Sequence, residues 1–169
     1  MEALFTSTAI VALAEIGDKT QLLAILLATR FRRPLPIILG ILVATLANHA
    51  LAALLGASAA AFLDSPVFRY AIGASFIAMA AWTLIPDTFD DDEAPKPRFG
   101  AFLTTLVAFF LVEMGDKTQV ATIALGAQYH DVVAVTAGTT LGMMIANVPA
   151  IFLGHELLKR VDLAKVRLV

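Results

Sequence analysis

The sequence EIGDKTQ at residues 15–21 returns almost unchanged as EMGDKTQ at residues 113–119. Each copy lies near the middle of a long apolar run and contains two acids and one lysine. A charged side chain at the centre of a bilayer costs roughly 3 kcal/mol on insertion scales, so such residues normally line an ion pathway or bind a substrate. The two strings therefore predict a transport site within a membrane.

Composition also indicates a membrane protein. Hydrophobic residues make up 59% of the chain and charged residues 15%, and the mean hydropathy is +0.83. Outside the apolar runs too little polar sequence remains for a soluble domain, so we expect the lipid bilayer as environment and no nucleic-acid partner. The chain has no cysteine, which excludes disulfides, thiolate metal sites and thiol chemistry. Nothing in the composition indicates an enzyme or a bound cofactor.

Five apolar runs are long enough to cross a bilayer as helices, which takes roughly 20 residues each. They cover about residues 4–28, 36–57, 68–86, 101–126 and 132–154. Residues 87–99, between the third and fourth runs, are rich in aspartate and proline and are predicted to form an acidic cytoplasmic linker. The linker divides the chain into a first membrane repeat, residues 1–86, and a second, residues 100–169.

The two parts correspond at an offset of 98 positions, which pairs Glu15 with Glu113, Asp18 with Asp116 and Gly40 with Gly138. Three spans are an odd number, so the second copy would enter the membrane from the opposite side. The predicted fold is an all-α polytopic membrane protein with two inverted three-helix repeats.

The sixth helix is expected to be missing from this chain. The counterpart of the third run begins at Val166, and the chain ends at Val169. Either the chain is a fragment of a six-helix protein, or another subunit of a homo-oligomer completes the second repeat.

Basic residues predict the orientation. Segments 30–33, 96–98 and 159–167 carry most of the arginines and lysines and would share one face, whereas the other face receives Arg69. The basic face should be cytoplasmic, which places the amino terminus outside the cytoplasm. The short chain without targeting extensions favours a prokaryotic inner (plasma) membrane.

The motif suits a hard divalent cation. In a continuous helix, residues three and four apart share a face, so Glu15 would cluster with Asp18 and Lys19, and the second motif would repeat this cluster. The carboxylates, hydroxyls and amides are oxygen ligands, which fit Mn²⁺ or Ca²⁺ better than zinc or copper. Lys19 and Lys117 are interpreted as counter-ions.

Charge counting predicts exchange with protons. Four acids and two lysines leave the paired motifs at −2, which one divalent cation would neutralise. An empty site would take up protons and a filled site would release them.

Several other residues lie on the predicted helices near the motifs. Gly17 and Gly115 indicate either local unwinding or close helix packing. Asn48 and Asn147 need hydrogen-bond partners in an apolar helix and are predicted to support the motif acids. His49 is interpreted as a packing or hydrogen-bonding residue. A further pair, Gly138 and Gly142, predicts a close helix contact.

Paired E-x-G-D-K-T motifs in an inverted hydrophobic duplication resemble the transmembrane protein 165 family of calcium and manganese transporters. The resemblance covers nearly the whole chain and implies a six-helix cation/proton exchanger that moves Mn²⁺ or Ca²⁺ out of the cytosol. It implies that the metal ligands are Glu15, Asp18, Glu113 and Asp116, with supporting oxygens from Thr20, Gln21, Thr118 and Gln119.

Three other functions could use the same residues in place of cation/proton exchange. A divalent cation channel would use the same acids without proton coupling. An intramembrane aspartyl protease would use two membrane aspartates, but its second motif, Tyr-Asp, does not occur in this sequence. A purely structural ion pair, for instance of Glu15 with Lys19, needs neither a second acid nor a duplicate motif.

Overall fold

The computed structural model describes residues 1–62, 66–83 and 100–160, and all regular structure in these ranges is helical. The seven helices are α1 (Glu2–Ala14), α2 (Lys19–Phe31), α3 (Pro34–Phe62), α4 (Pro66–Thr83), α5 (Ala101–Glu113), α6 (Lys117–Tyr129) and α7 (Val132–Arg160). The linker expected at residues 87–99 and the segment expected to begin a sixth helix lie outside the described residues.

Two predicted spans are each broken into a pair of shorter helices. Continuous helices were expected over residues 4–28 and 101–126, but α1 and α2, and likewise α5 and α6, are separate helices of 13 residues. A helix of this length covers about 20 Å, so each pair placed end to end spans an apolar core of about 30 Å. The expectation failed because the residues on both sides of each break are apolar, and hydropathy does not report backbone direction.

The unbroken helices support the membrane assignment. Segments Pro34–Ala59 of α3 and Val132–Leu153 of α7 are long and apolar enough to cross a membrane. Large apolar side chains lie exposed along their outer surfaces, including Leu39 and Val43 on α3 and Leu141 and Ile145 on α7. Exposed apolar patches of this kind suit contact with lipid.

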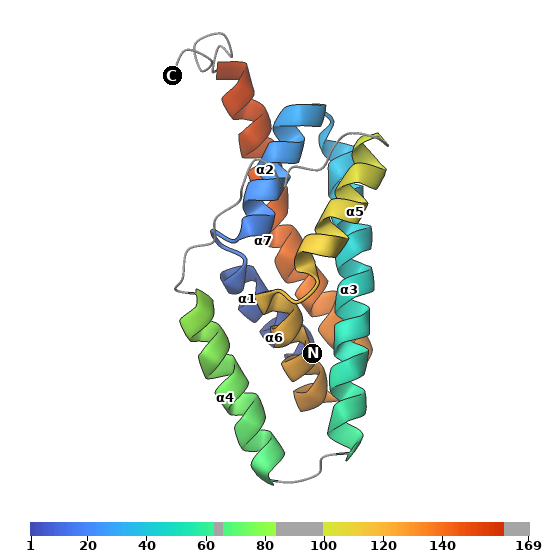
Figure 1. The fold of residues 1–169 in the computed structure, drawn as a ribbon, viewed down its shortest axis with the longest axis vertical. Coiled ribbons are helices and arrows are strands. Elements are labelled where there is room, and N and C mark those ends of the chain that lie inside the picture. Colours follow the sequence, from blue (N-terminus) through green and yellow to red (C-terminus); the bar gives the residue numbers. More distant parts are fainter. Residues whose placement is uncertain (63–65, 84–99, 161–169) are drawn as a thin grey trace.

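Each long helix packs against the broken pair from the other half of the chain. Helix α3 contacts α5 and α6, and α7 contacts α1 and α2. In Figure 1 the chain ascends through α1 and α2 and descends through α5 and α6. Helix α4 lies at one side, against α6. The motif-bearing breaks therefore meet in the interior of the bundle.

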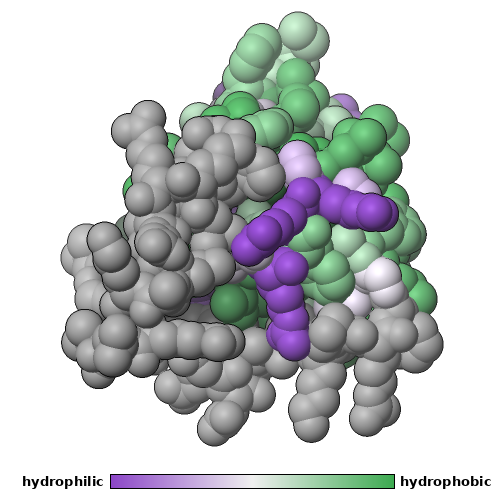
Figure 2. Space-filling view, turned by 90° about the horizontal axis from the view of Figure 1, so that it is seen from above, coloured by the Kyte–Doolittle hydropathy of each residue, from purple (hydrophilic) through white to green (hydrophobic). Residues whose placement is uncertain are grey.

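One end of the bundle is basic. Arg30, Arg32 and Arg33 are exposed where α2 ends and α3 begins, and Figure 2 shows hydrophilic side chains gathered on this face. This end is called the arginine end below, and the opposite end is called the N-terminal end because α1 begins there.

Glycines permit the close approach of helices. A Cβ placed on Gly142 of α7 would lie 2.7 Å from the carbonyl oxygen of Thr8 and 2.8 Å from the amide nitrogen of Ala12, both on α1. Gly138 is similarly close to the Leu4 carbonyl oxygen, at 2.5 Å. The predicted close helix contact is confirmed, and its partner is α1.

We expect Gly142→Ala to destabilise the bundle, because its Cβ would meet backbone atoms that cannot move independently. The cost should be about 1–3 kcal/mol, the usual range for overpacking, seen as a lower thermal unfolding midpoint of the detergent-solubilised protein. Gly73→Ala on α4 is the matched control, since nothing lies within 4 Å of a Cβ there. Equal midpoints for the two variants would contradict the close contact.

Candidate metal centre

The first motif turns the chain between two helices. Glu15 caps the end of α1, with its N–H donating to the Val11 carbonyl, and Asp18 caps the start of α2. Between them Gly17 has a φ of +78°, a left-handed conformation that costs other residues about 1–2 kcal/mol. The side-chain oxygen of Gln21 accepts a hydrogen bond of 3.0 Å from the Gly17 N–H. That bond satisfies a backbone group freed by the break.

The second motif repeats this geometry. Glu113 is the last residue of α5, Gly115 has a φ of +80°, and Asp116 caps the start of α6. The Gln119 side-chain oxygen accepts from the Gly115 N–H at 2.7 Å. Local unwinding at both glycines is confirmed. The alternative of close packing is wrong, because nothing lies within 4 Å of a Cβ at either position.

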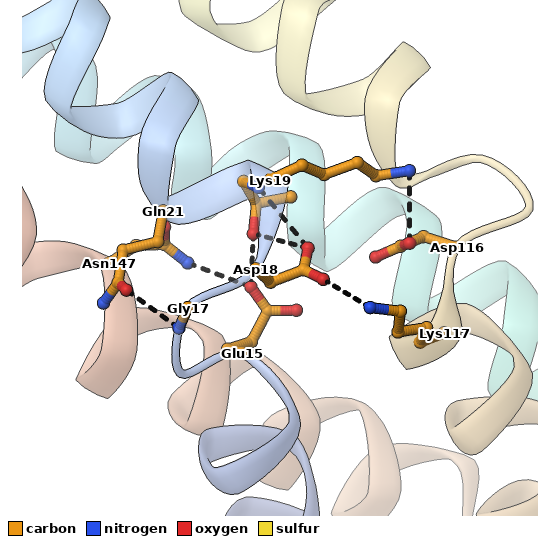
Figure 3. A network of polar contacts seen from close by, with 9 residues as sticks. Glu15, Gly17, Asp18, Lys19, Gln21, Asp116, Lys117 and Asn147 are labelled. Atoms are coloured by element: carbon orange, nitrogen blue, oxygen red, sulfur yellow. Dashed lines mark hydrogen bonds and ion pairs between the residues drawn. The ribbon is translucent and has the colours of Figure 1, made fainter. Parts of the chain in front are cut away.

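The lysines pair across the two motifs. Lys19 Nζ lies 3.2 Å from Asp116 Oδ1, and Lys117 Nζ lies 3.4 Å from Asp18 Oδ1 (Figure 3). The expected clustering of each lysine with its own motif acids on one helical face is wrong, because the break points Lys19 and Lys117 toward the other motif. We call these two ion pairs the crossed pairs. Lys117 also lies 5.9 Å from the ring centroid of Trp82 on α4, a neighbour that the sequence did not indicate.

Three of the four acids come together. Carboxylate oxygens of Glu15, Asp18 and Asp116 lie within 4.8 Å of one another, and all three side chains are buried. Glu15 Oε1 and Asp116 Oδ2 have no hydrogen-bond partner among the described residues. Buried carboxylate oxygens without donors are costly, and a cation would satisfy them. This set is called the three-acid group.

Glu113 lies outside the three-acid group and is held by α3. Thr45 Oγ1 donates to Glu113 Oε1 at 2.9 Å, and Asn48 Nδ2 lies 3.4 Å from Glu113 Oε2. Asn48 also donates to the Phe110 carbonyl at 2.9 Å. Thr45 was not predicted from the sequence, although its position one helical turn before Asn48 on a buried face was a usable signal.

Glu15 has different partners. It accepts a short hydrogen bond from the hydroxyl of Thr20, and Asn147 Nδ2 of α7 lies 3.4 Å from its Oε2. The corresponding hydroxyl in the second motif, Thr118 Oγ1, has no partner in the described part of the chain. Each asparagine therefore lies beside one motif glutamate, but the two motifs are not equivalent.

The arrangement can bind a hard cation. Carboxylates, hydroxyls and amide oxygens surround the three-acid group, and Mn²⁺ and Ca²⁺ are bound by such ligands. Each of the two lysines is paired with an aspartate that belongs to this group. The arrangement therefore combines negative charge with unpaired oxygen atoms in a site shielded from bulk water.

We expect Gly17→Ala to destabilise the protein by about 1 kcal/mol through backbone strain alone, because the side chain has free space. Gly17→Asn should cost less, since asparagine tolerates the left-handed region. Thermal unfolding of the two variants and the wild type measures both effects. Identical stability of Gly17→Ala and the wild type would show that the break does not require a positive φ.

Several known proteins are similar to this chain in sequence. The sequence model of the family described as divalent cation/proton antiporter GDT1 matches residues 3–91 and 101–169. A Vibrio cholerae protein named "Putative manganese exporter" is 51% identical over 170 residues, covering 100% of this chain and 84% of that protein. The GDT1-like protein sll0615 of Synechocystis is 28% identical, covering 95% of this chain and 86% of that protein. No solved structure matches the chain.

These matches confirm the resemblance to the transmembrane protein 165 family, because that family and the matched GDT1 family are the same. The family consists of transporters and not of enzymes. The chain belongs to the GDT1 family of divalent cation/proton antiporters, and it is an integral membrane protein that transports divalent cations.

Proposed function

We propose that this protein is a secondary transporter that exports Mn²⁺ or Ca²⁺ from the cytosol in exchange for protons. The observation that carries the proposal is the three-acid group, with two buried carboxylate oxygens that have no donor among the described residues. Glu15, Asp18 and Asp116 would bind the ion in this conformation, and Glu113, the fourth motif acid, would serve as a proton-binding group of the same site.

Charge balance supports exchange. With the crossed pairs formed, each lysine offsets one aspartate, which leaves the charges of Glu15 and Glu113. One divalent cation or two protons would neutralise them. Binding of the ion would therefore displace protons, and protons would displace the ion.

The packing supports inverted repeats. The two broken pairs run in opposite directions in Figure 1, and each long helix packs on the broken pair of the other half. Discontinuous helices that meet at the middle of the membrane are typical of substrate sites in transporters with this symmetry.

We propose that the arginine end faces the cytoplasm. Exposed arginines at that end agree with the positive-inside rule, and this orientation places the amino terminus outside. The Vibrio relative supports a prokaryotic inner membrane and makes Mn²⁺ the first ion to test.

Proteoliposomes with an internal pH dye test the exchange. We expect external Mn²⁺ to enter as protons leave, so that the interior becomes alkaline. Glu15→Gln and Asp116→Asn should slow both fluxes at least about tenfold, because loss of even an outer-shell partner costs 10–100-fold in metal affinity.

Glu2→Gln is the matched control, since Glu2 is an exposed carboxylate remote from the motifs, and it should transport as the wild type does. Mn²⁺ flux without alkalinisation would favour a channel and contradict proton coupling. Full transport by both motif variants would contradict the site.

We expect the two motif glutamates to differ in their contribution to ion binding. Glu15 Oε1 lies beside two aspartates and has no hydrogen-bond partner in the part of the chain that the structure describes, whereas both oxygens of Glu113 face donors from α3. At fixed pH, Glu15→Gln should weaken Mn²⁺ binding at least about tenfold more than Glu113→Gln does. Titration calorimetry of the purified variants measures this difference, and equal losses would place Glu113 among the ligands.

A further inference from the structure

Four helices meet in an apolar layer on the N-terminal side of the acids. Its members are the buried side chains Ala3 of α1, Ala53 of α3, Leu125 of α6 and Val135 of α7, which pack together. On each of these helices the layer lies on the side of the motif acids that faces the N-terminal end.

One helical turn toward the acids, all four helices present a polar side chain. Residues three or four apart share a helical face, so the next positions are Ser7, His49, Thr122 and Thr139. All four are fully buried, at 0% exposure. We call this set the polar layer.

Contacts of the same helices show that the polar layer lies on the side of the apolar layer that faces the motif acids. Helix α1 ends at Glu15 and α6 begins beside Asp116. Thr45 of α3 binds Glu113, and Asn147 of α7 lies beside Glu15. In each case the polar residue lies between the apolar layer and the motif acids.

The polar layer is rich in unsatisfied hydrogen-bonding atoms. Thr122 donates to the Thr118 carbonyl at 2.7 Å and Thr139 to the Val135 carbonyl at 2.9 Å, so each hydroxyl keeps free lone pairs. Ser7 Oγ and both ring nitrogens of His49 have no partner among the residues that the structure describes. Buried polar atoms in this state cost about 1–3 kcal/mol each. Water that bonds two to four such groups removes the cost.

We propose that the polar layer holds water and that His49 passes protons through it between the motif acids and the N-terminal end. This role rests on the proposed proton exchange. A neutral imidazole accepts a proton on one ring nitrogen and releases the proton from the other, so that the ring remains neutral after each transfer.

His49 is well placed for this task among the titratable side chains of the four helices. On α1 these are Glu2, which is exposed, and Glu15 of the site; on α6 they are Lys117 of the site and Tyr129, which packs against the apolar layer. The part of α7 with described side chains, residues 132–153, contains none. Within the described region, His49 is therefore the titratable group between the apolar layer and the acids.

The test compares two exchange modes of the same reconstituted protein. Exchange of radioactive Mn²⁺ for unlabelled Mn²⁺ needs only the ion-loaded carrier, whereas Mn²⁺–proton exchange also needs the proton path. We expect His49→Gln and His49→Asn to slow Mn²⁺–proton exchange at least about tenfold, in line with the contribution of a positioned proton-transfer group. Mn²⁺–Mn²⁺ exchange should stay within about twofold of the wild type, which also shows that the variants fold.

Two results would overturn the role of His49. Normal Mn²⁺–proton exchange in the variants would show that protons do not need the ring, and an equal fall in both exchange modes would show a structural role. Failure of the proposed function looks different, because the wild type itself would then move Mn²⁺ without protons.

The absence of cysteine from the chain allows an independent test of hydration. Ser7→Cys should react with a small water-soluble methanethiosulfonate during turnover with Mn²⁺, whereas Ile37→Cys, fully buried in the apolar cluster near the arginine end, should not. Reaction of Ser7→Cys no faster than Ile37→Cys would show a dry layer and overturn the proposal.

Discussion

The crossed pairs of lysine and aspartate hold the two halves of this protein to each other. Each pair joins a residue at the start of α2 to a residue at the start of α6, so neither motif keeps its charges compensated without the other. The Lys117–Asp18 pair is buried, and removing one partner from such a pair costs about 3–5 kcal/mol, mostly because an unpaired charge remains. The Lys19–Asp116 pair is weaker because Lys19 is 31% exposed to solvent. Because both motif-bearing spans break at the same depth in the bundle, each lysine reaches the aspartate of the other motif. The helix breaks, the crossed pairs and the three-acid group are therefore a single structural feature.

Much of the site was predictable from the duplicated string, and the failures have a common cause. The positions of the acids, the asparagines and the close contact at Gly142 follow from local sequence and helical spacing. The breaks within the first and fourth spans were not predicted, because an apolar run has the same composition whether its backbone is helical or turned. The adjacent glycine and aspartate were the signal, since glycine ends helices in the left-handed conformation and aspartate begins them. Once the break was missed, the lysines were assigned to the wrong partners.

Duplication of the motif does not make the two halves equal. An offset of 98 places Met143 opposite Thr45, so α3 offers a hydroxyl to Glu113 where α7 offers none to Glu15. Glu15 instead accepts a hydrogen bond from Thr20 of its own motif, and its Oε1 has no partner among the residues described. Under the proposed exchange, the ion and the proton would therefore prefer different glutamates, although the sequence around both is almost the same.

The apolar packing is also unequal on the two sides of the acids. On the N-terminal side the apolar layer consists of two alanines, a leucine and a valine, with half-buried side chains such as Phe76 behind it. The cluster toward the arginine end contains the larger, fully buried side chains Leu23, Leu27, Ile37, Ile41 and Phe109. Separating apolar surfaces costs about 25 cal/mol per Å² exposed, so the smaller layer is the easier one to open. If the arginine end faces the cytoplasm, this conformation is closed more firmly on the inside, which is the state from which an exporter releases its ion.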